Sequence, residues 1–315
     1  MGVGYTLATM SERKTTKVLN IRELVAQATA KAKEPIPCFI VISGKSAGRL
    51  YKLASELAVI GRGADATIYI DDDSISRFHA QVRKTASGIV VEDLDSTNGT
   101  FFNGDKKAAH VLQDGDKIQI GSTTILKFSH ADGLEEEFHR NLYESATRDP
   151  LTSAYNKKFF VERLSSELTY AVRHKTELSL AMLDLDHFKK VNDIHGHAGG
   201  DAILKHFVAL VHGLIRGEDV LGRCGGDEFA IIFRETPAQE ALNVAERIRK
   251  RLEGSVCEHQ GRPIPVTCSI GVCTTRGANP SSAGDLLKAT DALLYQAKQA
   301  GRNRAISGWS HADAG

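Results

Sequence analysis

The sequence predicts two folded domains, an all-β sandwich followed by an α+β domain of ferredoxin-like topology. With 315 residues the chain is long enough for about two domains of roughly 150 residues each. Short runs of β-forming residues, separated by Gly, Asp, Asn and Ser, occupy residues 37–130. Helix-type and strand-type patterns alternate over residues 149–310, which is typical of an α+β domain.

The composition is that of a globular protein without a general affinity for nucleic acid. Apolar residues make up 42% of the chain and charged residues 25%, and the net charge is only +1. The five cysteines are scattered and odd in number, which indicates buried thiols in a reducing compartment. No apolar run approaches the ~18 residues of a membrane span, and the first ten residues make a poor signal peptide. We therefore expect a cytoplasmic protein without a membrane span, translated from Met1 or from Met10.

Residues 1–36 predict a flexible arm with one short amphipathic helix over Val18–Ala28. In the β domain, residues 37–130, Asn103-Gly104 is expected to be only a hairpin turn. The expected strands of this domain cover residues 38–42, 49–53, 57–61, 66–70, 79–84, 88–94, 99–104, 117–121 and 123–128.

A polar helix is expected to connect the two domains over residues 131–148. Leu134, Phe138, Leu142 and Tyr143 recur there at helical spacing, which makes one side of the helix a candidate dimer seam.

The α+β domain, residues 149–310, is followed by a short tail at 311–315. Its strands and helices are expected in the order βααββαβ after a first helix. The elements in order are a helix at 156–174, a strand at 178–186, helices at 187–196 and 201–215, a hairpin around 225–226, a helix at 237–254, a strand at 265–275 and a helix at 283–301.

Two clusters of carboxylates in this domain suggest a metal site. The stretch "RCGGDEFAIIF" places Asp227 and Glu228 at a hairpin whose two glycines are expected to adopt positive φ. Asp184 ends the expected strand before it, and Asp186 is expected to cap the next helix. Three carboxylates at adjoining strand ends are suited to a pair of Mg²⁺ ions that bind phosphates. The spacing alone is equally compatible with a helix cap and solvated surface charges.

Several ordered motifs in residues 146–308 resemble those of the GGDEF diguanylate cyclase family. They are "DPLTSAYN" at 149–156, "DLDHFKKVND" at 184–193, "GHAGGD" at 196–201, "GGDEF" at 225–229 and "ALLYQAKQAGRNRA" at 292–305. The resemblance implies a polymerase-palm-like fold and the condensation of two GTP into cyclic di-GMP with release of pyrophosphate. It also implies a homodimer, because each subunit would hold one GTP.

The resemblance further implies a role for each matching residue. Asp184, the Leu185 carbonyl, Asp227 and Glu228 would bind two Mg²⁺ per site, for which Mn²⁺ could substitute, and Asp227 and Glu228 would be the catalytic pair. The residues that would bind GTP are Asn192 and Asp201, which would hydrogen-bond guanine, Lys298 and Arg302, which would bind the β- and γ-phosphates, and Lys189 and His197. Outside a motif, Lys298 and Arg302 would be no more than a basic helix end.

Two further features bear on this resemblance. Ser153-Ala154 stands where the family usually has Gly-Leu, which questions helix packing more than activity. "RGED" precedes the signature at the spacing of the family's RxxD site, so Arg216 and Asp219, helped by Arg223, would bind the product and inhibit the enzyme. The alternative for Arg216 and Asp219 is a surface ion pair.

Residues 37–130 resemble the forkhead-associated (FHA) family, a β-sandwich that binds phosphothreonine peptides. The match rests on "IGRGADATIYIDDDSISRFHAQV" and "DLDSTNGTFFNG". It implies that Arg62 pairs with the phosphate and that His79 braces the loops inside the domain. The other implied peptide ligands are Ser76, Arg77, Thr97 and Asn98.

The ligand of this domain is expected to be a phosphothreonine made by a Ser/Thr kinase. Thr15 and Thr16 in the arm are candidate phosphosites, and a tethered ligand would need only modest affinity. An external phosphoprotein is equally plausible. The favoured function is a phosphothreonine-gated diguanylate cyclase; the alternatives are an inactive sensor of GTP or cyclic di-GMP joined to an adaptor, and a scaffold.

Overall fold

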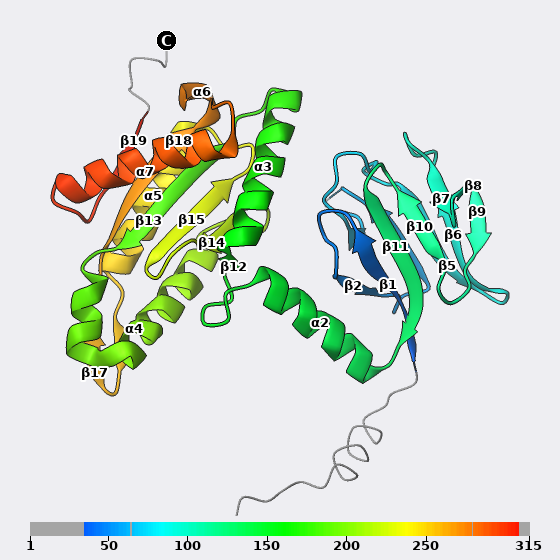
Figure 1. The fold of residues 1–315 in the computed structure, drawn as a ribbon, viewed down its shortest axis with the longest axis horizontal. Helices are drawn as coiled ribbons and strands as arrows, with labels where there is room; N and C mark the ends of the chain where they lie inside the picture. The colour runs from blue at the N-terminus through cyan, green and yellow to red at the C-terminus, as the bar shows by residue number, and fades with distance from the viewer. Residues whose placement is uncertain (1–34, 64, 279, 309–315) are drawn as a thin grey trace, which may run out of the picture. The chain divides into compact units, whose positions relative to one another are not determined.

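The computed structural model describes residues 35–308, apart from residues 64 and 279 (Figure 1). The expected arm helix at Val18–Ala28 and the candidate phosphosites Thr15 and Thr16 lie outside these residues. The chain divides into two compact units between Asn141 and Leu142. In the part of the chain that the structure describes, no helix is long and apolar enough to cross a membrane.

The first unit is a β-sandwich, as the sequence predicts. One sheet has the order β2-β1-β11-β10-β7-β8 and the other the order β4-β3-β5-β6-β9. Apolar side chains from both sheets, among them Phe39, Ile60, Val82 and Phe128, form one core. The strands are β1 (Ile36–Ser43), β2 (Leu50–Lys52), β3 (Leu57–Gly61), β4 (Ile68–Tyr69), β5 (Ala80–Thr85), β6 (Gly88–Asp93), β7 (Thr100–Phe102), β8 (Asp105–Lys106), β9 (Ala109–Val111), β10 (Lys117–Ile120) and β11 (Thr124–Ala131).

The connecting helix is present as α2 (Gly133–Thr147). The carboxylate of Asp132 accepts hydrogen bonds from the backbone N–H groups of Leu134 and Glu135, both at 2.8 Å, which explains where the helix begins. Leu134, Phe138 and Leu142 follow one another at intervals of four residues and are all more than half exposed.

The second unit is an α+β domain around one six-stranded sheet of order β12-β14-β15-β13-β18-β19. Its strands are β12 (Tyr155–Asn156), β13 (Ser179–Leu185), β14 (Val220–Arg223), β15 (Glu228–Phe233), β18 (Cys268–Thr274) and β19 (Ala305–Ser307), with a separate hairpin β16 (Cys257–His259) and β17 (Arg262–Ile264). Its helices are α3 (Lys157–His174), α4 (Phe188–His212), α5 (Ala238–Glu253), α6 (Thr275–Ala278) and α7 (Ala283–Gln299).

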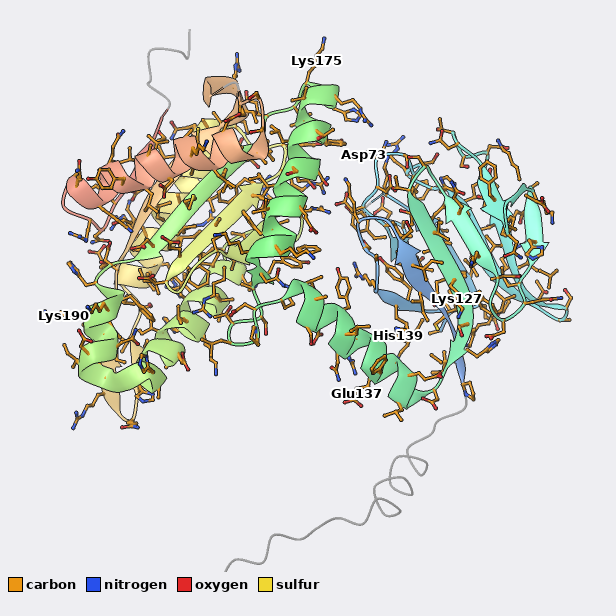
Figure 2. The ribbon with its side chains drawn as sticks, viewed as in Figure 1. Asp73, Lys127, Glu137, His139, Lys175 and Lys190 are labelled. Atoms are coloured by element: carbon orange, nitrogen blue, oxygen red, sulfur yellow. The ribbon has the colours of Figure 1, made fainter. Side chains whose placement is uncertain are left out.

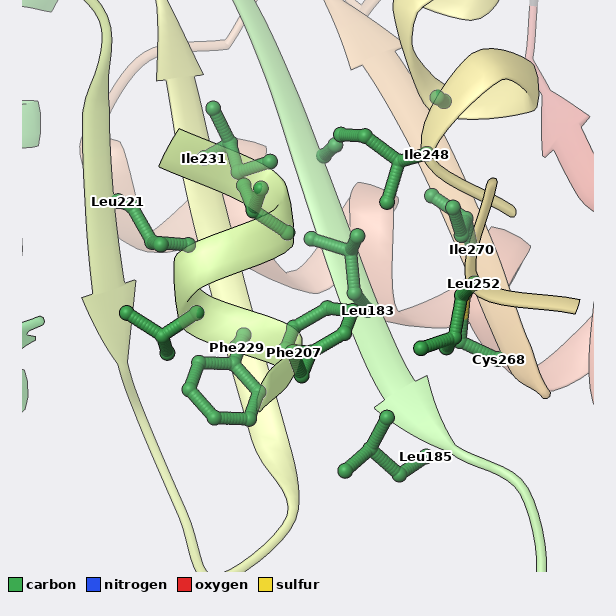
Figure 3. Close-up of a cluster of buried hydrophobic side chains, with 14 of the residues drawn as sticks. Leu183, Leu185, Phe207, Leu221, Phe229, Ile231, Ile248, Leu252, Cys268 and Ile270 are labelled. Atoms are coloured by element: carbon green, nitrogen blue, oxygen red, sulfur yellow. The ribbon is translucent and has the colours of Figure 1, made fainter. Parts of the chain in front are cut away.

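The strands of this sheet are buried on both faces. Alternate residues pack against α4 and α5 on one side, as Leu183, Phe229 and Ile231 do in Figure 3. The residues between them, such as Met182 and Ile232, pack toward α3 and α7. The predicted βααββαβ order is therefore confirmed, with the two helices after β13 joined into α4 across a kink at Gly196.

Candidate functional site

The two carboxylate clusters are brought together by the pairing of β13 with β15. Asp184 lies opposite Glu228 in the antiparallel register, and the Leu185 N–H donates to the Asp227 carbonyl at 3.3 Å. The predicted neighbourhood of Asp184, Asp227 and Glu228 thus follows from one strand pair. The predicted hairpin between β14 and β15 is present, and the N–H groups of Cys224 and Gly225 donate to the Glu228 carbonyl at 2.9 and 3.2 Å.

The reason expected for the two glycines is wrong. Neither Gly225 nor Gly226 has a positive φ. Instead, a Cβ on Gly225 would stand 2.5 Å from the Glu228 Oε2, whereas one on Gly226 would meet nothing within 4 Å. Gly225 therefore gives the Glu228 carboxylate space beside the backbone.

Asp184 is the most electrostatically loaded residue of the site. Burial raises the pKa of its carboxyl, and the charges of Asp227 and Glu228 raise it further, while Lys298 lowers it. The Lys298 Nζ lies 2.8 Å from the Asp184 Oδ2. Lys298 therefore places one positive charge beside the carboxylates, and a bound metal cation could supply a further one.

The donor set fits Mg²⁺ in chemistry but does not form a finished cage. Asp184, Asp227, Glu228 and the Leu185 carbonyl offer the hard oxygen atoms that Mg²⁺ prefers. Among the described residues, no group of three or more His, Cys, Asp or Glu side chains is arranged to hold a metal ion. The three carboxylates are thus neighbours along one strand pair, without forming a complete set of metal ligands among the described residues.

The prediction that Asp186 caps the next helix is wrong. The residue at the cap of α4 is His187, with φ of 58° and no side-chain cap bond. Asp186 is 5% exposed, and its carboxylate accepts hydrogen bonds from Thr267, Ser269 and the backbone of Asn303. Asp186 thus joins the end of β13 to β18 and to the turn before β19.

The residues expected to bind guanine lie on either side of the kink in α4. Gly196 has φ of 69° and ψ of 171°, and beyond it the chain folds back so that Gly200 contacts Asn192. A Cβ on Gly200 would lie 2.0 Å from the Asn192 Oδ1. Only glycine at position 200, next to Asp201, therefore lets the Asn192 side chain approach this closely. Asp201 is exposed and Asn192 partly exposed.

Three further predicted GTP ligands, Lys189, His197 and Arg302, are exposed, whereas Lys298 is partly buried. Lys189 and His197 lie on α4 before and after the kink. Arg302 is exposed in the turn after α7, where it has φ of 63°. A separate cavity of ≈ 570 Å³ is lined in part by His187, Lys190 and Ile264, and by none of the predicted GTP ligands. Figure 2 shows that the Lys190 side chain points outward from α4.

The predicted inhibitory site is assembled only in part. The Arg216 N–H donates to the Asp219 carboxylate at 2.9 Å, and burial raises the pKa of Asp219. Arg223 lies at the other end of β14, so the structure does not bring it to Asp219. Arg247 of α5, which the sequence analysis missed, donates to the Leu214 carbonyl at 2.7 Å beside this loop; helix periodicity gave no signal for it.

Arg223 instead ties the signature hairpin to the start of the domain. Its guanidinium donates to the Gly226 carbonyl at 2.6 Å and to the Asp149 carboxylate at 2.9 Å. The turn that Asp149 opens contains Ser153, whose φ of 61° is left-handed and explains why glycine suits this position. Ala154 is fully buried.

The predicted phosphopeptide ligands gather on two loops of the β-sandwich. The Ser76 hydroxyl accepts a hydrogen bond from the Thr97 N–H at 3.0 Å, and the Asn98 amide donates to the Ser74 carbonyl at 2.7 Å. The Nε of Arg62 is buried without a partner in the described residues, and Arg77 is exposed. One partly buried guanidinium near exposed hydroxyls is suited to a phosphate.

His79 has the bracing role that the sequence analysis gave it. It is fully buried, and its Nδ1 accepts a hydrogen bond from the Ser76 N–H while its Nε2 lies 3.3 Å from the Gly99 carbonyl. Asn103-Gly104 is a two-residue hairpin turn with positive φ at both residues, as predicted.

Comparisons with known proteins agree with both family resemblances. Residues 146–304 match the model of the diguanylate cyclase GGDEF domain, and residues 58–121 match that of the FHA domain. The diguanylate cyclase DgcP of Pseudomonas aeruginosa is 35% identical over 249 residues, which cover 74% of this chain and 37% of that protein. The probable diguanylate cyclase DgcT of Escherichia coli is 37% identical over 163 residues, 51% of this chain and 35% of its own length. This chain thus spans little more than a third of either relative.

Solved structures show the same fold for the second unit. The GGDEF domain of DgcB from Caulobacter crescentus, in complex with c-di-GMP, aligns with a TM-score of 0.50 and 31% identity over 52% of this chain and 94% of that one. The diguanylate cyclase SiaD of Pseudomonas aeruginosa, in complex with its activator SiaC, aligns with a TM-score of 0.51 and 33% identity over 55% of this chain and 66% of that one.

Proposed function

Because the chain belongs to the GGDEF diguanylate cyclase family, we propose that it condenses two GTP into cyclic di-GMP and releases pyrophosphate. The observation that carries the proposal is the register of β13 and β15, which sets Asp184 opposite Glu228 beside Asp227, with Lys298 at 2.8 Å from Asp184. This is a cluster of anionic oxygens with one adjacent cation, as a phosphoryl-transfer site requires.

Each residue of the cluster has a task in this reaction. Asp184, the Leu185 carbonyl, Asp227 and Glu228 would hold two Mg²⁺, which when bound neutralise the phosphates and favour loss of a proton from the 3′-hydroxyl. Asp227 accepts that proton from the attacking hydroxyl. The Glu228 carboxylate, which has room because Gly225 has no side chain, contributes negative charge for the metal ions. In-line displacement then depends mainly on positioning.

Substrate recognition is divided between the two ends of GTP. Asn192 and Asp201 hydrogen-bond the guanine, since a carboxylate accepts from its N1–H and amino group, which adenine cannot offer. Lys298 and Arg302 neutralise the triphosphate, and Lys189 and His197 are further ligands of GTP.

The test is chromatography of the nucleotides after incubation with GTP and Mg²⁺. Cyclic di-GMP is expected from the unaltered protein and none from Asp227→Asn. Asp193→Asn is the matched control, because it removes one carboxylate from an exposed position of α4 that has no part in the proposed site. Absence of product both before and after phosphorylation of the protein would favour the sensor instead.

A homodimer would bring two GTP-loaded sites together. The exposed apolar residues Leu134, Phe138 and Leu142 of α2 are the surface that we propose for its seam. Sedimentation should show a dimer in the unaltered protein and a monomer after Phe138→Glu, with loss of product at equal protein concentration.

The β-sandwich would gate the enzyme by binding a phosphothreonine peptide through Arg62, Ser76, Arg77, Thr97 and Asn98. The buried Nε of Arg62 supports this, since it has no hydrogen-bond partner among the described residues and can donate to a phosphate. A phosphothreonine peptide of the arm sequence around Thr15 and Thr16 should bind and its unphosphorylated form should not. Full regulation in the Thr15→Ala/Thr16→Ala protein would point to an external phosphoprotein.

Product would inhibit through Arg216 and Asp219. Asp219 holds the loop by its bond to the Arg216 N–H. The Arg216 guanidinium is exposed and forms only a long surface ion pair with Glu240, at 3.7 Å, which a phosphate or guanine could replace. Arg216→Ala should therefore accumulate more cyclic di-GMP with an unchanged initial rate. Earlier inhibition in this variant than in the unaltered protein would contradict the assignment.

A further inference from the structure

Asp186 stands two residues after Asp184 but takes no part in the proposed metal site. Its Oδ1 accepts from the Ser269 hydroxyl at 2.6 Å. Its Oδ2 accepts from the Thr267 hydroxyl at 2.7 Å and from the Asn303 N–H at 3.0 Å. A carboxylate that is 5% exposed and has three donors is a fixed point in the structure.

The turn that Asp186 holds has an unfavourable backbone. Gly301, Arg302 and Asn303 are three consecutive residues with positive φ, of 109°, 63° and 46°. Glycine and asparagine adopt positive φ readily, but arginine does so at a cost, so tertiary contacts must help to hold Arg302 there. The Asn303 side chain supplies two, with Glu253 at 2.7 Å and Arg249 at 3.0 Å, and Asp186 supplies the bond to the backbone itself.

Arg302 is the residue of this turn whose side chain we expect to bind phosphate. Its N–H bonds the Ala297 carbonyl at 3.1 Å, while its side chain is exposed and makes no hydrogen bond or ion pair within the described residues. The place from which the Arg302 side chain extends therefore depends on the backbone on either side of it. On one side that backbone is α7, whose Lys298 contacts Asp184; on the other side it is Asn303, which contacts Asp186.

We propose that Asp186 is a positioning residue for triphosphate binding, which acts by fixing the turn that carries Arg302 against the strand end that carries Asp184. The proposal rests on the phosphate-binding role proposed above for Arg302. The two carboxylates of the "DLD" segment thereby fix the positions of Lys298 and Arg302 relative to each other. Asp184 does so through the Lys298 side chain, and Asp186 does so through the backbone of Asn303.

A carboxylate serves the three donors better than an amide would. The hydroxyls of Thr267 and Ser269 can rotate and accept instead, but the Asn303 N–H can only donate. In Asp186→Asn, one of the two carboxylate oxygens becomes an NH₂ group. If that group faces Asn303, two donors oppose each other; if it faces Ser269, the remaining oxygen must serve both Thr267 and Asn303 without the charge that strengthened those bonds.

The experiment compares the binding of 3′-deoxy-GTP, which lacks the attacking hydroxyl, with that of GMP by calorimetric titration. Asp186→Asn is expected to weaken 3′-deoxy-GTP about tenfold, as partners that orient a ligand group typically do, and to leave GMP unchanged. Thr267→Val, which keeps the side-chain shape and removes one donor, is expected to give a smaller loss of the same kind. Asp193→Asn removes an equal negative charge from an exposed site, and it should leave triphosphate binding unchanged or slightly stronger.

A double-mutant cycle with Arg302→Ala decides whether the effect passes through Arg302. Asp186→Asn should add nothing to Arg302→Ala if it acts by positioning that side chain. Equal weakening of GMP and 3′-deoxy-GTP, or additive losses in the double variant, would show a merely structural role and overturn the inference. If Arg302→Ala alone leaves 3′-deoxy-GTP binding unchanged, the proposed function of Arg302 fails instead, and the inference falls with it.

Discussion

Replacing Gly200 by alanine should separate base recognition from the stability of the fold. Gly200 lies within α4, next to the proposed guanine ligand Asp201. The added Cβ would stand 2.0 Å from the Asn192 Oδ1, 3.0 Å from the Asn192 Cγ and 3.1 Å from the Phe188 Cζ. All three are side-chain atoms, so the helix backbone can remain while the Asn192 amide is pushed away.

The size of the effect follows from these distances. Because real Cβ contacts are essentially never under 3.0 Å, the Asn192 oxygen must retreat by about 1 Å or more. A hydrogen bond of ordinary length does not survive such a displacement. Loss of one bond to the base corresponds to about 1–1.5 kcal/mol, or roughly a tenfold weaker affinity for GTP. Alanine meanwhile favours a helix over glycine by up to about 1 kcal/mol, so the variant should be at least as stable as the unaltered protein.

The assay pairs calorimetric titration of GTP and ATP analogues with thermal unfolding. We expect guanine affinity to fall, the weak adenine affinity to change little, and the unfolding temperature to hold or rise. Gly284→Ala is the matched control, because it also places alanine in a helix but meets only the Ser282 Oγ, at 3.6 Å. A Gly200→Ala protein that binds GTP as tightly as the control would refute the assignment of Asn192 to the base.

Three further outcomes are expected. In metal-free protein, Asp184→Asn should raise the free energy of unfolding at pH 8. The pKa of Asp184 is raised in the folded protein, so keeping its carboxylate ionised there costs stability. That cost is complete above the folded-state pKa and disappears below the unfolded-state pKa, so the stability gained by the variant should vanish in acid. Lower stability of the variant at pH 8 would contradict this. Ser153→Gly should stabilise the second unit by about 0.5 kcal/mol in urea unfolding, because it removes a left-handed serine at φ of 61°; a loss of stability would show that the turn tolerates serine without strain. Burial lowers the pKa of His79, so the first unit should lose stability as the pH falls below about 6.5, where the unfolded histidine gains a proton; a His79→Gln variant with the same pH dependence would exclude His79 as its source.

The sequence predicted elements with a strong apolar pattern and missed those without one. The run "LSLAMLDLD" corresponds to β13, which is buried along nearly its whole length, and all the long helices were located. The missed elements are short: β8 and β12 have two residues each, β9, β16, β17 and β19 three, and the helix α6 four. Asp105–Lys106 of β8 is exposed and paired only with β7, so its backbone partner rather than its side chains makes it a strand.

The site residues were predictable where a residue type follows from chemistry, and unpredictable where a partner comes from elsewhere in the chain. Carboxylates for a metal and arginines for phosphate have recognisable spacing. Arg223 was assigned to the wrong neighbourhood for lack of such information, since only the fold shows that it points to Asp149 and Gly226 rather than to Asp219. Arg247 was missed because its neighbour at Leu214 is 33 residues away.

The roles of the two aspartates in the segment "DLD" could not be predicted from the sequence. Asp184 and Asp186 are the same residue type two positions apart, and the sequence analysis assigned one to a metal and the other to a helix cap. Their tasks differ because of what β18 and the turn after α7 place around them. Asp184 faces Lys298 and two further carboxylates, which raise the demand for a cation. Asp186 accepts hydrogen bonds from two hydroxyls and a backbone N–H, which satisfy its charge. A carboxylate with competing anions remains available for metal and substrate, whereas a satisfied one becomes part of the frame, and only the folded chain distinguishes the two.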